Sequence, residues 1–416
     1  MPRAETNWAR NYAFRPATVH RPSTLEEVQG IAAGARRVHV LGSRHSFHGM
    51  ADSLELISLD ALPPNVVVDG SSRTISCSAG LTYATLARAL AARGLALRNL
   101  ASHAHFTVGG AVATATHGSG DASGNLATAV AGLELVTSSG EIVEASRGDA
   151  EFEGLVVGLG ALGAVTRITL DVEPAYEVRQ RVFEGLAWEA LLDHFDEIMG
   201  AGYSVSVFTG WGDAVEQVWV KSRVTDAHET VRGDLFGAVP STVERHPELG
   251  VDPVDCSAQL GRPGPWFDRL PHFRIGFTPG TGDQLQSEYL VPRRHGKAAI
   301  LAMRALADRI RPVLRVGEIR TIAADRLWMS PQYGEDTVGL HFTWTLDQAA
   351  VERVLVDIET ALVPLQARPH WGKLFLAGTP TIALLYERLP DFKRLAGRLD
   401  PRGAFGNAWL KTHVLE

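Results

Sequence analysis

The chain has 416 residues, of which 45% are hydrophobic and 21% are charged, and its formal net charge is -7. This composition is typical of a globular enzyme and excludes a disordered or fibrous chain, while the length predicts two domains, one of them split by the other. The negative charge argues against nucleic acid or an anionic membrane as the main partner, because either would require a basic surface.

The segment from Met1 to Trp8 contains no apolar run, so we expect neither a signal peptide nor a membrane anchor, and predict a cytoplasmic protein. The two cysteines, Cys77 and Cys256, are far apart and lack metal-ligand spacing, which predicts no disulfide framework and no metal site. Cys77 falls on the apolar side of an alternating segment and is predicted to be a buried thiol. No feature of the sequence requires more than a monomer.

The first predicted element is a helix that begins near residue 23. Ser23 and Glu26 have the spacing of a capping box, with Ser23 as the N-cap. Leu25, Val28 and Ile31 would then form the buried face of this helix.

A loop rich in small polar residues follows an alternating strand predicted at 37–41. The loop consists of Val40, Leu41, Gly42, Ser43, Arg44, His45 and Ser46. Gly42 lets the backbone approach a ligand, and successive loop N–H groups can form a concavity for phosphate oxygens. His45 offers a ring nitrogen that can act as a metal ligand, a base or a nucleophile. Taken alone, a histidine between serines is more often a loop residue without a catalytic role.

A second glycine-rich stretch, 102–120, follows strands predicted at 65–69 and 74–79 and a helix predicted at 82–93. Its residues of interest are Ser102, Thr107, Gly109, Gly110, Ala111, Val112, Ala113, His117 and Gly118. The stretch lacks the Gly-Lys-Ser/Thr ending of a nucleoside triphosphate site and the spaced glycines of a Rossmann turn. A dinucleotide whose pyrophosphate lies on backbone amides and hydroxyls is therefore the better fit.

The middle of the chain predicts a change of domain. A hairpin is predicted for 132–145, and a strand follows the glycines at 158–163, up to a boundary at Glu173-Pro174. Alternating apolar residues at 203–220 then predict a second, largely antiparallel sheet. Seven of the 21 prolines fall between 225 and 284, which predicts long loops there.

A helix is predicted at 297–311, and two strands are predicted after it, at 316–321 and 338–344. In each strand, polar side chains point to one side. A period of two places Glu318 and Arg320 on one face of the first strand, and His341 and Thr343 on one face of the second. An ordinary ion pair on a solvated sheet face is the simple alternative. The apolar residues opposite, and a glycine before each pair, favour a sheet that covers a site. Asp347 is predicted to cap the next helix, and Lys373, taken alone, would be a surface lysine.

At the two glycine-rich stretches the sequence resembles the vanillyl-alcohol oxidase family of FAD enzymes, and most closely its bacterial alditol oxidases. The resemblance extends from Asn7-Trp8 to the closing segment 400–407. It implies an α+β, two-domain FAD-binding fold of the PCMH/vanillyl-alcohol oxidase type. An FAD-binding domain at 1–174 would be followed by an antiparallel-sheet substrate (cap) domain at 175–370 and a C-terminal segment, 371–416, that returns to the active site.

The resemblance implies that both glycine-rich stretches wrap the FAD and that His45 carries a covalent bond to it. The other implied FAD contacts are Val40, Leu41, Gly42, Ser43, Arg44, Ser46, Tyr83, Ser102, Thr107, Gly109, Gly110, Ala111, Val112, Ala113, His117, Gly118 and Val165. Two positions depart from the family pattern. Arg44 stands where the family has glycine, which would cost about 1 kcal/mol if the position needs positive φ. His103-Ala104 also differs, which bears on substrate preference.

The resemblance also implies a polyol site in front of the flavin. Its residues are Ser102, Glu318, Arg320, His341, Thr343 and Lys373. Alcohol oxidation removes the hydroxyl proton and transfers a hydride to flavin N5, so the developing alkoxide needs cations such as Arg320 and Lys373. His341 is a candidate proton acceptor because its ordinary pKa of about 6.5 lies near working pH, beside direct activation by the two cations. Glu318 would orient Arg320.

The expected reaction is oxidation of the terminal primary alcohol of alditols such as xylitol or sorbitol to the aldose, with O2 reduced to H2O2. Two alternatives stay open: a sugar-1,4-lactone oxidase or dehydrogenase of the same family, and a non-catalytic flavin- or nucleotide-binding module. The sequence leaves open whether oxygen or another compound accepts the electrons.

Overall fold

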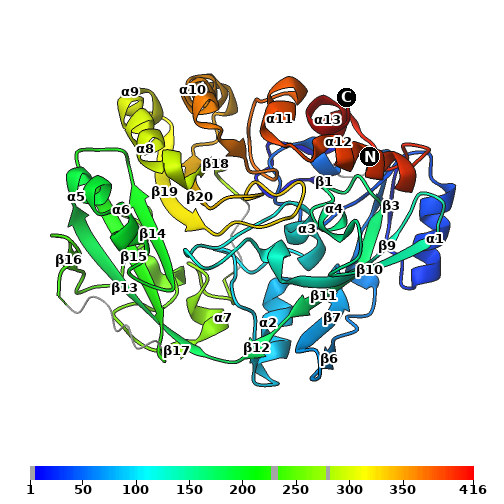
Figure 1. Ribbon diagram of the computed structural model, residues 1–416, viewed down its shortest axis with the longest axis horizontal. Coiled ribbons are helices and arrows are strands. Elements are labelled where there is room, and N and C mark those ends of the chain that lie inside the picture. Colours follow the sequence, from blue (N-terminus) through cyan, green and yellow to red (C-terminus); the bar gives the residue numbers. More distant parts are fainter. Residues whose placement is uncertain (1–4, 226–232, 278–281) are drawn as a thin grey trace.

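The computed structural model describes residues 5–225, 233–277 and 282–416, which form two lobes (Figure 1). The first lobe, coloured blue to cyan, contains a parallel three-stranded sheet with the order β3 (Thr18–His20), β5 (Glu55–Ile57), β4 (Val38–Val40). Beside it an antiparallel five-stranded sheet has the order β10 (Ile142–Ser146), β9 (Val130–Val136), β11 (Ala164–Asp171), β7 (Thr74–Ser78), β6 (Val67–Asp69). Two short pairs join β1 (Glu5–Thr6) to β2 (Ala13–Phe14) and β8 (Leu95–Ala96) to β12 (Glu173–Pro174).

Short helices complete this lobe. They are α1 (Leu25–Gly34), α2 (Tyr83–Ala91), α3 (Val108–Ala113) and α4 (Phe152–Val156). The predicted cap of α1 is wrong by one residue, because the Thr24 hydroxyl, not that of Ser23, accepts the Glu27 N–H. The carboxylate of Glu27, not Glu26, returns to accept the Ser23 N–H at 2.6 Å. The predicted hairpin is confirmed by β9 and β10, which turn through Gly140 at a φ of 83°.

The second lobe is built on a nine-stranded sheet, shown on the left of Figure 1. Its order is β16 (Val239–Pro240), β13 (Glu177–Leu186), β15 (Val215–Arg223), β14 (Ser204–Thr209), β19 (Leu314–Ile322), β20 (Thr337–Trp344), β18 (Leu285–Pro292), β21 (Arg368–Pro369), with β17 (Gly264–Pro265) beside β13. Every pairing is antiparallel, which confirms the predicted sheet type.

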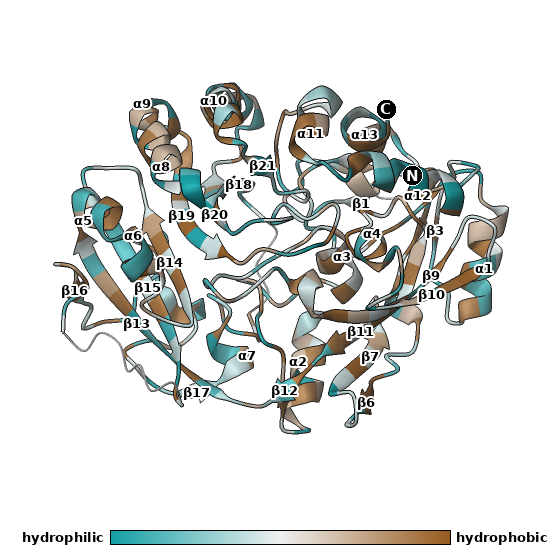
Figure 2. Cartoon of the chain, viewed as in Figure 1, coloured by the Kyte–Doolittle hydropathy of each residue, from teal (hydrophilic) through white to brown (hydrophobic). Residues whose placement is uncertain are grey.

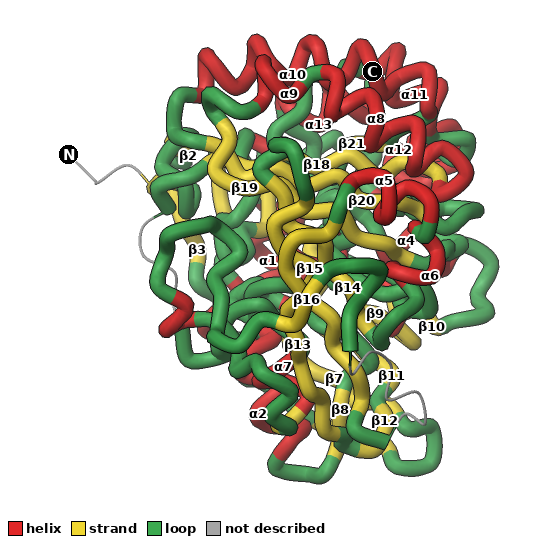
Figure 3. Tube along the Cα trace, turned by 90° about the vertical axis from the view of Figure 1, so that its left-hand side faces the viewer, coloured by secondary structure: helices red, strands yellow, loops and turns green. Residues whose placement is uncertain are grey.

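Helices cover one face of this sheet and continue as a layer across the molecule, which is seen as the red elements along the top of Figure 3. They are α5 (Trp188–Asp193), α6 (Phe195–Met199), α8 (Gly296–Ala305), α9 (Ala307–Ile310), α10 (Gln348–Leu362), α11 (Thr379–Leu385), α12 (Leu389–Leu399) and α13 (Ala408–Leu410), while α7 (Trp266–Arg269) lies below the sheet. The helix predicted at 297–311 is in fact two, because Leu306 leaves helical geometry at ψ 6°. Asp347 caps α10 as predicted.

The register of the sheet separates an apolar face from a polar one. Leu340, Phe342 and Trp344 of β20 are fully buried, and the brown segments of the strands in Figure 2 trace such residues. A slip of one residue would exchange the two faces and turn these side chains away from the core, at a cost of roughly 1.5–3 kcal/mol for each. Burial on the apolar face therefore fixes which side chains point to the other lobe.

The C-terminal segment ties the first lobe together around β4. Val38 donates its N–H to the carbonyl of Ala404, and the Asp400 carboxylate accepts the N–H groups of Ala404 and Phe405. Phe47 donates to the carbonyl of Gly372 at 3.1 Å. The loop that follows β4 is thus held in place by residues more than 300 positions away.

The remaining predictions about the chain concern loops and cysteines. Cys77 is fully buried, as predicted, and both Cys77 and Cys256 are free thiols. Residues 225–284 contain mainly loops, as predicted, although 226–232 and 278–281, like the first four residues, lie outside the described residues. Among the helices of the described chain, none combines the length and apolarity needed to cross a bilayer.

Candidate active site

A cavity of about 850 Å³ is lined by residues of both lobes. Sixteen of the predicted cofactor residues line it: Val40, Leu41, Gly42, Ser43, Arg44, His45, Ser46, Ser102, Thr107, Gly109, Gly110, Ala111, Val112, Ala113, His117 and Val165. Tyr83 and Gly118 lie behind this wall instead. Tyr83 is buried in the core, and a Cβ on Gly118 would lie 2.4 Å from the carbonyl oxygen of Leu100, so this glycine permits close packing.

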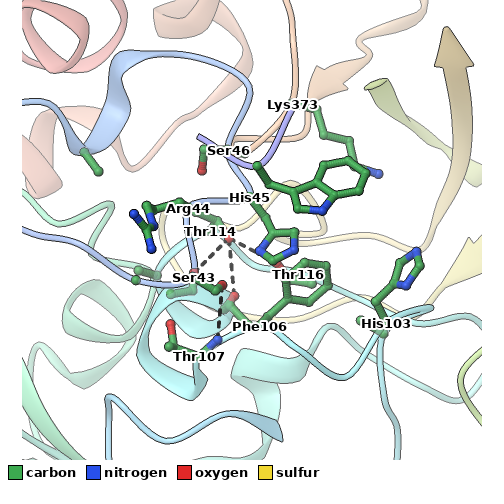
Figure 4. Close-up of a pocket in the computed structure, with 18 of the residues that line it drawn as sticks. Ser43, Arg44, His45, Ser46, His103, Phe106, Thr107, Thr114, Thr116 and Lys373 are labelled. Atoms are coloured by element: carbon green, nitrogen blue, oxygen red, sulfur yellow. Dashed lines mark hydrogen bonds between the residues drawn. The ribbon is translucent and has the colours of Figure 1, made fainter. Parts of the chain in front are cut away.

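His45 projects from the loop after β4 into the cavity wall (Figure 4). Its ring stacks on Trp8, with centroids 5.6 Å apart, and meets Phe106 edge-on at 4.7 Å. Its Nδ1 is buried and has no hydrogen-bond partner among the described residues. Burial lowers the pKa of His45 to about 4, so the ring is neutral near pH 7. A neutral ring with an unengaged nitrogen is the form that a nucleophile requires.

The two glycine-rich stretches meet at Thr107. Its N–H donates to the Ser43 hydroxyl at 3.3 Å, which Figure 4 marks with a dashed line. A Cβ at either Gly42 or Gly110 would lie 2.8 Å from Thr107 Oγ1, so the two glycines let the stretches pack closely around this hydroxyl. The Thr107 hydroxyl itself is buried without a partner in the described chain. The wall of the cavity therefore contains a buried hydrogen-bonding group that no described residue uses.

Arg44 has the positive φ that the sequence analysis considered, at 62°. A non-glycine residue in the left-handed region costs roughly 1–2 kcal/mol. Its guanidinium forms an ion pair with Glu5 at the edge of the cavity. The loop thus keeps the glycine-like backbone although the residue is arginine.

The second lobe contributes the polar face of its sheet. All six predicted substrate residues, Ser102, Glu318, Arg320, His341, Thr343 and Lys373, line the cavity. Glu318 and Arg320 are each 4% exposed, so the alternative of a solvated ion pair is wrong. Lys373 is not a surface lysine either, because its side chain is only 14% exposed and its Nζ donates to a buried carboxylate at 2.6 Å.

That carboxylate belongs to Glu288, which the sequence analysis missed. Glu288 Oε1 accepts a hydrogen bond from Arg320 Nη2 at 2.8 Å, whereas Glu318 Oε1 lies 3.5 Å from Arg320 Nε. Glu288, rather than Glu318, is therefore the main partner of Arg320. Gly339 makes room for it, because a Cβ there would lie 3.0 Å from Glu288 Oε1. The signal in the sequence was the alternation of Gln286 and Glu288 along β18.

His341 lies opposite both Glu288 and Glu318 in the sheet register. Its Nδ1 accepts a hydrogen bond from Lys373 Nζ at 2.8 Å, and its Nε2 lies 3.2 Å from Thr343 Oγ1. Burial, together with the charge of Lys373, lowers the pKa of His341 to about 4. His341 was a candidate proton acceptor because the ordinary pKa of histidine, about 6.5, lies near working pH. In the folded protein its pKa is lower, so this reason does not hold.

We expect Glu288→Gln to lower the free energy of unfolding by about 3 kcal/mol, because two buried cations lose their carboxylate. Burial raises the pKa of Glu288, but Arg320 and Lys373 lower it more, to well below 4.5. A depressed folded-state pKa stabilises the protein above the unfolded-state value, and this contribution is lost as the pH falls. Urea unfolding should show a large difference from wild type at pH 7 that stays constant down to about pH 4.5 and shrinks only as the pH falls further.

Glu144→Gln is the matched control, because Glu144 pairs with Arg167 at 2.8 Å but its side chain is 68% exposed. An exposed pair contributes roughly 0–1 kcal/mol. Equal losses in the two variants would contradict the assignment of Glu288 as the centre of the buried charge cluster.

His117, Glu288 and His370 also approach one another closely enough to hold a metal ion. Two observations oppose this use. Glu288 already neutralises Arg320 and Lys373, whose positive charges would repel a divalent cation. In addition, His370 Nδ1 accepts the N–H of Gly372 at 3.1 Å. The absence of a metal site stays a prediction.

Comparison with known proteins decides the family. Residues 16–146 match the FAD binding domain family, and residues 278–413 match the D-arabinono-1,4-lactone oxidase family. An alditol oxidase of Streptomyces sp. (strain IKD472 / FERM P-14339) is 46% identical to this chain, and the alignment covers 99% of each protein. The chain belongs to the alditol oxidase group of the vanillyl-alcohol oxidase family. The resemblance seen in the sequence is thereby confirmed, and the protein is an FAD-dependent oxidoreductase.

Other members of the family are more distant. An L-gulono-1,4-lactone dehydrogenase of Mycobacterium tuberculosis is 27% identical, with 98% of each chain covered. A crystal structure of cholesterol oxidase from B. sterolicum has a TM-score of 0.80 at 13% identity, covering 99% of this chain and 96% of that one. The second likeness concerns the fold alone, and it confirms the predicted fold class.

The residues present fit the FAD of an alditol oxidase family member. Gly42 and Gly110 pack closely around Thr107 on the cavity wall, and the buried Thr107 hydroxyl lacks a partner in the described chain. His45 lines the same cavity, and its buried Nδ1 has no hydrogen-bond partner in the described chain. Residues of the first lobe would therefore hold the FAD, with the polar face of the second lobe across the cavity from them.

Proposed function

We propose that this protein oxidises the terminal primary alcohol of alditols such as xylitol and sorbitol to the aldose, with FAD bound covalently through His45 and O2 reduced to H2O2. The observation that carries this proposal is the buried pair of cations, Arg320 and Lys373, which share Glu288 on the wall of the FAD cavity. The alditol oxidase of Streptomyces, similar along its whole length, supports the substrate class.

Arg320 and Lys373 would stabilise the alkoxide that develops as the substrate hydroxyl loses its proton. Arg320 stays charged at all working pH values, and its Nη1 lies 3.4 Å from the Ser102 hydroxyl, at the meeting point of the two lobes. When bound, FAD supplies the acceptor for the hydride that leaves the same carbon. Lys373 would lie near both the alkoxide and the carbonyl edge of the ring system.

Two routes for the hydroxyl proton remain consistent with the geometry. In the first route, Lys373, which donates to the Nδ1 of neutral His341 at 2.8 Å, passes that proton to His341 and takes the substrate hydroxyl proton in its place. In the second route, Arg320 and Lys373 lower the pKa of the hydroxyl and the proton leaves through solvent. Both routes use the two cations, which makes Arg320 the residue whose removal tests the mechanism.

The remaining polar groups suit a chain of hydroxyls. Ser102, Thr343 and Glu318 offer donors and acceptors along the cavity. In such a site, buried polar groups of the protein form hydrogen bonds with the substrate hydroxyls. An analogue that lacks one hydroxyl leaves its protein partner unpaired, which lowers kcat/KM by roughly 10⁴-fold or more. Polyols therefore suit the site better than simple alcohols.

A sugar-1,4-lactone is the second candidate substrate. The match of residues 278–413 to the D-arabinono-1,4-lactone oxidase family favours it, because this segment includes β18, β19 and β20, which carry the polar face. The L-gulono-1,4-lactone dehydrogenase that matches nearly the whole chain is only 27% identical, however.

We expect xylitol, added without oxygen, to bleach the visible flavin absorbance of the purified holoenzyme, and air to restore it with release of H2O2. The same titration with L-gulono-1,4-lactone should leave most of the absorbance unchanged. Stopped-flow spectrophotometry measures both, and 1-propanol is the control for a primary alcohol without further hydroxyls.

The outcomes separate the candidate functions. Bleaching by the lactone alone would overturn the polyol assignment in favour of a lactone oxidase or dehydrogenase. Bleaching by none of the three would support a flavin-binding module without catalysis. Bleaching by xylitol without recovery in air would retain the substrate and replace oxygen by another electron acceptor.

A further inference from the structure

A buried chain of ionisable side chains lies behind the polar face. Lys221, on β15, is 1% exposed, and its Nζ donates to the carbonyl oxygens of Leu270 and Pro271 and to His272 Nδ1, the last at 3.2 Å. His272 Nε2 lies 2.9 Å from Glu318 Oε1. Lysine is almost never fully buried unless it is paired, so this chain requires an explanation.

The hydrogen bonds determine where the protons lie. A charged ammonium has three N–H groups, and those of Lys221 are all used, two by carbonyls and one by His272. His272 accepts at Nδ1, so its single ring proton is on Nε2 and points to Glu318. If Lys221 lost its proton, His272 would have to be doubly protonated to keep both bonds. One positive charge is therefore shared by Lys221 and His272.

The positive charge shared by Lys221 and His272 affects Arg320 because Glu318 contacts both His272 and Arg320. Glu318 takes its short hydrogen bond from His272, and its Oε1 is 3.5 Å from Arg320 Nε. Arg320 Nε is buried and has no hydrogen-bond partner among the described residues. Three cations, Lys221, Arg320 and Lys373, face two carboxylates, Glu288 and Glu318, which leaves one positive charge in the cluster.

We propose that Lys221 and His272 are positioning residues: their shared positive charge holds Glu318 on His272 and keeps it from forming a short hydrogen bond to the Arg320 guanidinium, which thereby stays available to the substrate oxygen. This inference rests on the proposed function, because it concerns the same alcohol site. The main chain supports it, since the His272 N–H donates to the Ser102 carbonyl at 3.1 Å. Phe208 and Trp219 meet the His272 ring edge-on, which prevents it from turning away from Glu318.

The other ionisable groups around the pair are Cys256, Glu318 and Arg320, with His103, His341 and Lys373 beside them. Burial raises the pKa of Cys256 to about 12, and burial lowers the pKa values of His103 and His341 to about 3 and about 4. These three groups therefore keep one charge state between pH 5 and 9. Burial lowers the pKa of Lys221 to about 7 and that of His272 to about 4, the charge of Lys221 adding to the second shift.

The test is the pH dependence of kcat/KM for xylitol between pH 5 and 9 in wild type, Lys221→Met and Lys221→Arg. Wild type should lose activity as the pH rises through about 7, where the shared charge is lost. In Lys221→Met only His272 can carry the charge, so the loss should begin at least one pH unit lower, with at least tenfold lower kcat/KM at pH 8. Lys221→Arg keeps its charge, so the loss near pH 7 should disappear.

His272→Gln is the second variant. Its amide can donate to Glu318 and accept from Lys221 without titrating, so it should keep the wild-type profile within a few-fold of wild-type activity. Profiles of the same shape in wild type and Lys221→Met would overturn the proposal, as would an equal loss in Lys221→Met and His272→Gln at every pH. Either result would mean that the residues serve packing alone.

A measurement without turnover separates this inference from the proposed function. In ¹⁵N-histidine NMR spectra the His272 signal, identified by its loss in His272→Gln, should show a proton on Nε2 at neutral pH. Its titration in Lys221→Met should move upward by at least one pH unit, because the opposing charge is gone. An unchanged titration would overturn the shared charge. A wild-type enzyme inactive on polyols would overturn the proposed function, and the NMR result would still decide the pairing.

Discussion

Replacement of Arg320 by alanine is expected to lower kcat/KM for xylitol by at least about 10³-fold, about 4 kcal/mol in the activation barrier, while the purified protein stays yellow. Arg320 is 4% exposed and lines the cavity, where it would provide donors to the substrate oxygen, whereas the residues proposed to hold FAD lie on the other lobe. Removing it also leaves Glu288 with Lys373 alone. Steady-state H2O2 production gives kcat/KM, and the absorbance of the bound flavin gives the fraction of loaded enzyme.

Arg315→Ala is the matched control for Arg320→Ala. Arg315 lies on the same strand, β19, and lines the same cavity, but it pairs with Glu248 and Asp283, each at 3.0 Å, and not with Glu288. Its loss should change kcat/KM by no more than a few-fold. If Arg320→Ala retained activity within tenfold of wild type, Arg320 would be removed from the mechanism and Lys373 would be the remaining cation.

Replacement of His45 by alanine is expected to convert flavin binding from covalent to dissociable. Acid precipitation of wild type should leave the yellow colour in the pellet, and the same treatment of His45→Ala should release all of it to the supernatant. The physical reason is that His45 lines the cavity with a neutral ring whose Nδ1 has no hydrogen-bond partner among the described residues. Fluorescence of the supernatant and the mass of the intact chain measure the two fractions.

His103→Ala is the control, because it tests the other histidine that could form the bond. His103 also lines the cavity with a buried Nδ1 that lacks a partner in the described chain, and burial lowers its pKa to about 3. Its ring, however, stacks on Phe273 with centroids 4.6 Å apart, on the side of the second lobe. Loss of the covalent flavin in His103→Ala but not in His45→Ala would reassign the linkage.

The polar face of the second lobe shows how far local pattern predicts a site. A period of two along β19 and β20 correctly placed Glu318, Arg320, His341 and Thr343 on one side, because the apolar residues opposite admit a single orientation. The same reasoning overlooked Glu288, because no strand was predicted for the segment that forms β18, just after the region where prolines predicted loops. Glu288 faces His341 across the sheet although 53 residues separate them in the chain, and local pattern does not contain such a pairing.

The amino-acid sequence by itself determined the two glycine-rich stretches, the antiparallel type of the second sheet and the family, because each depends on the order of residues along short segments. Only the tertiary structure decided which charges meet. The residues around Lys373 and Lys221 in the sequence do not indicate that either lysine is buried. In the folded chain, Lys373 donates to the carboxylate of Glu288 and Lys221 to the imidazole of His272, each on another segment. The strength and the protonation of such groups depend on burial and on distant neighbours, and these exist only once the lobes have packed together.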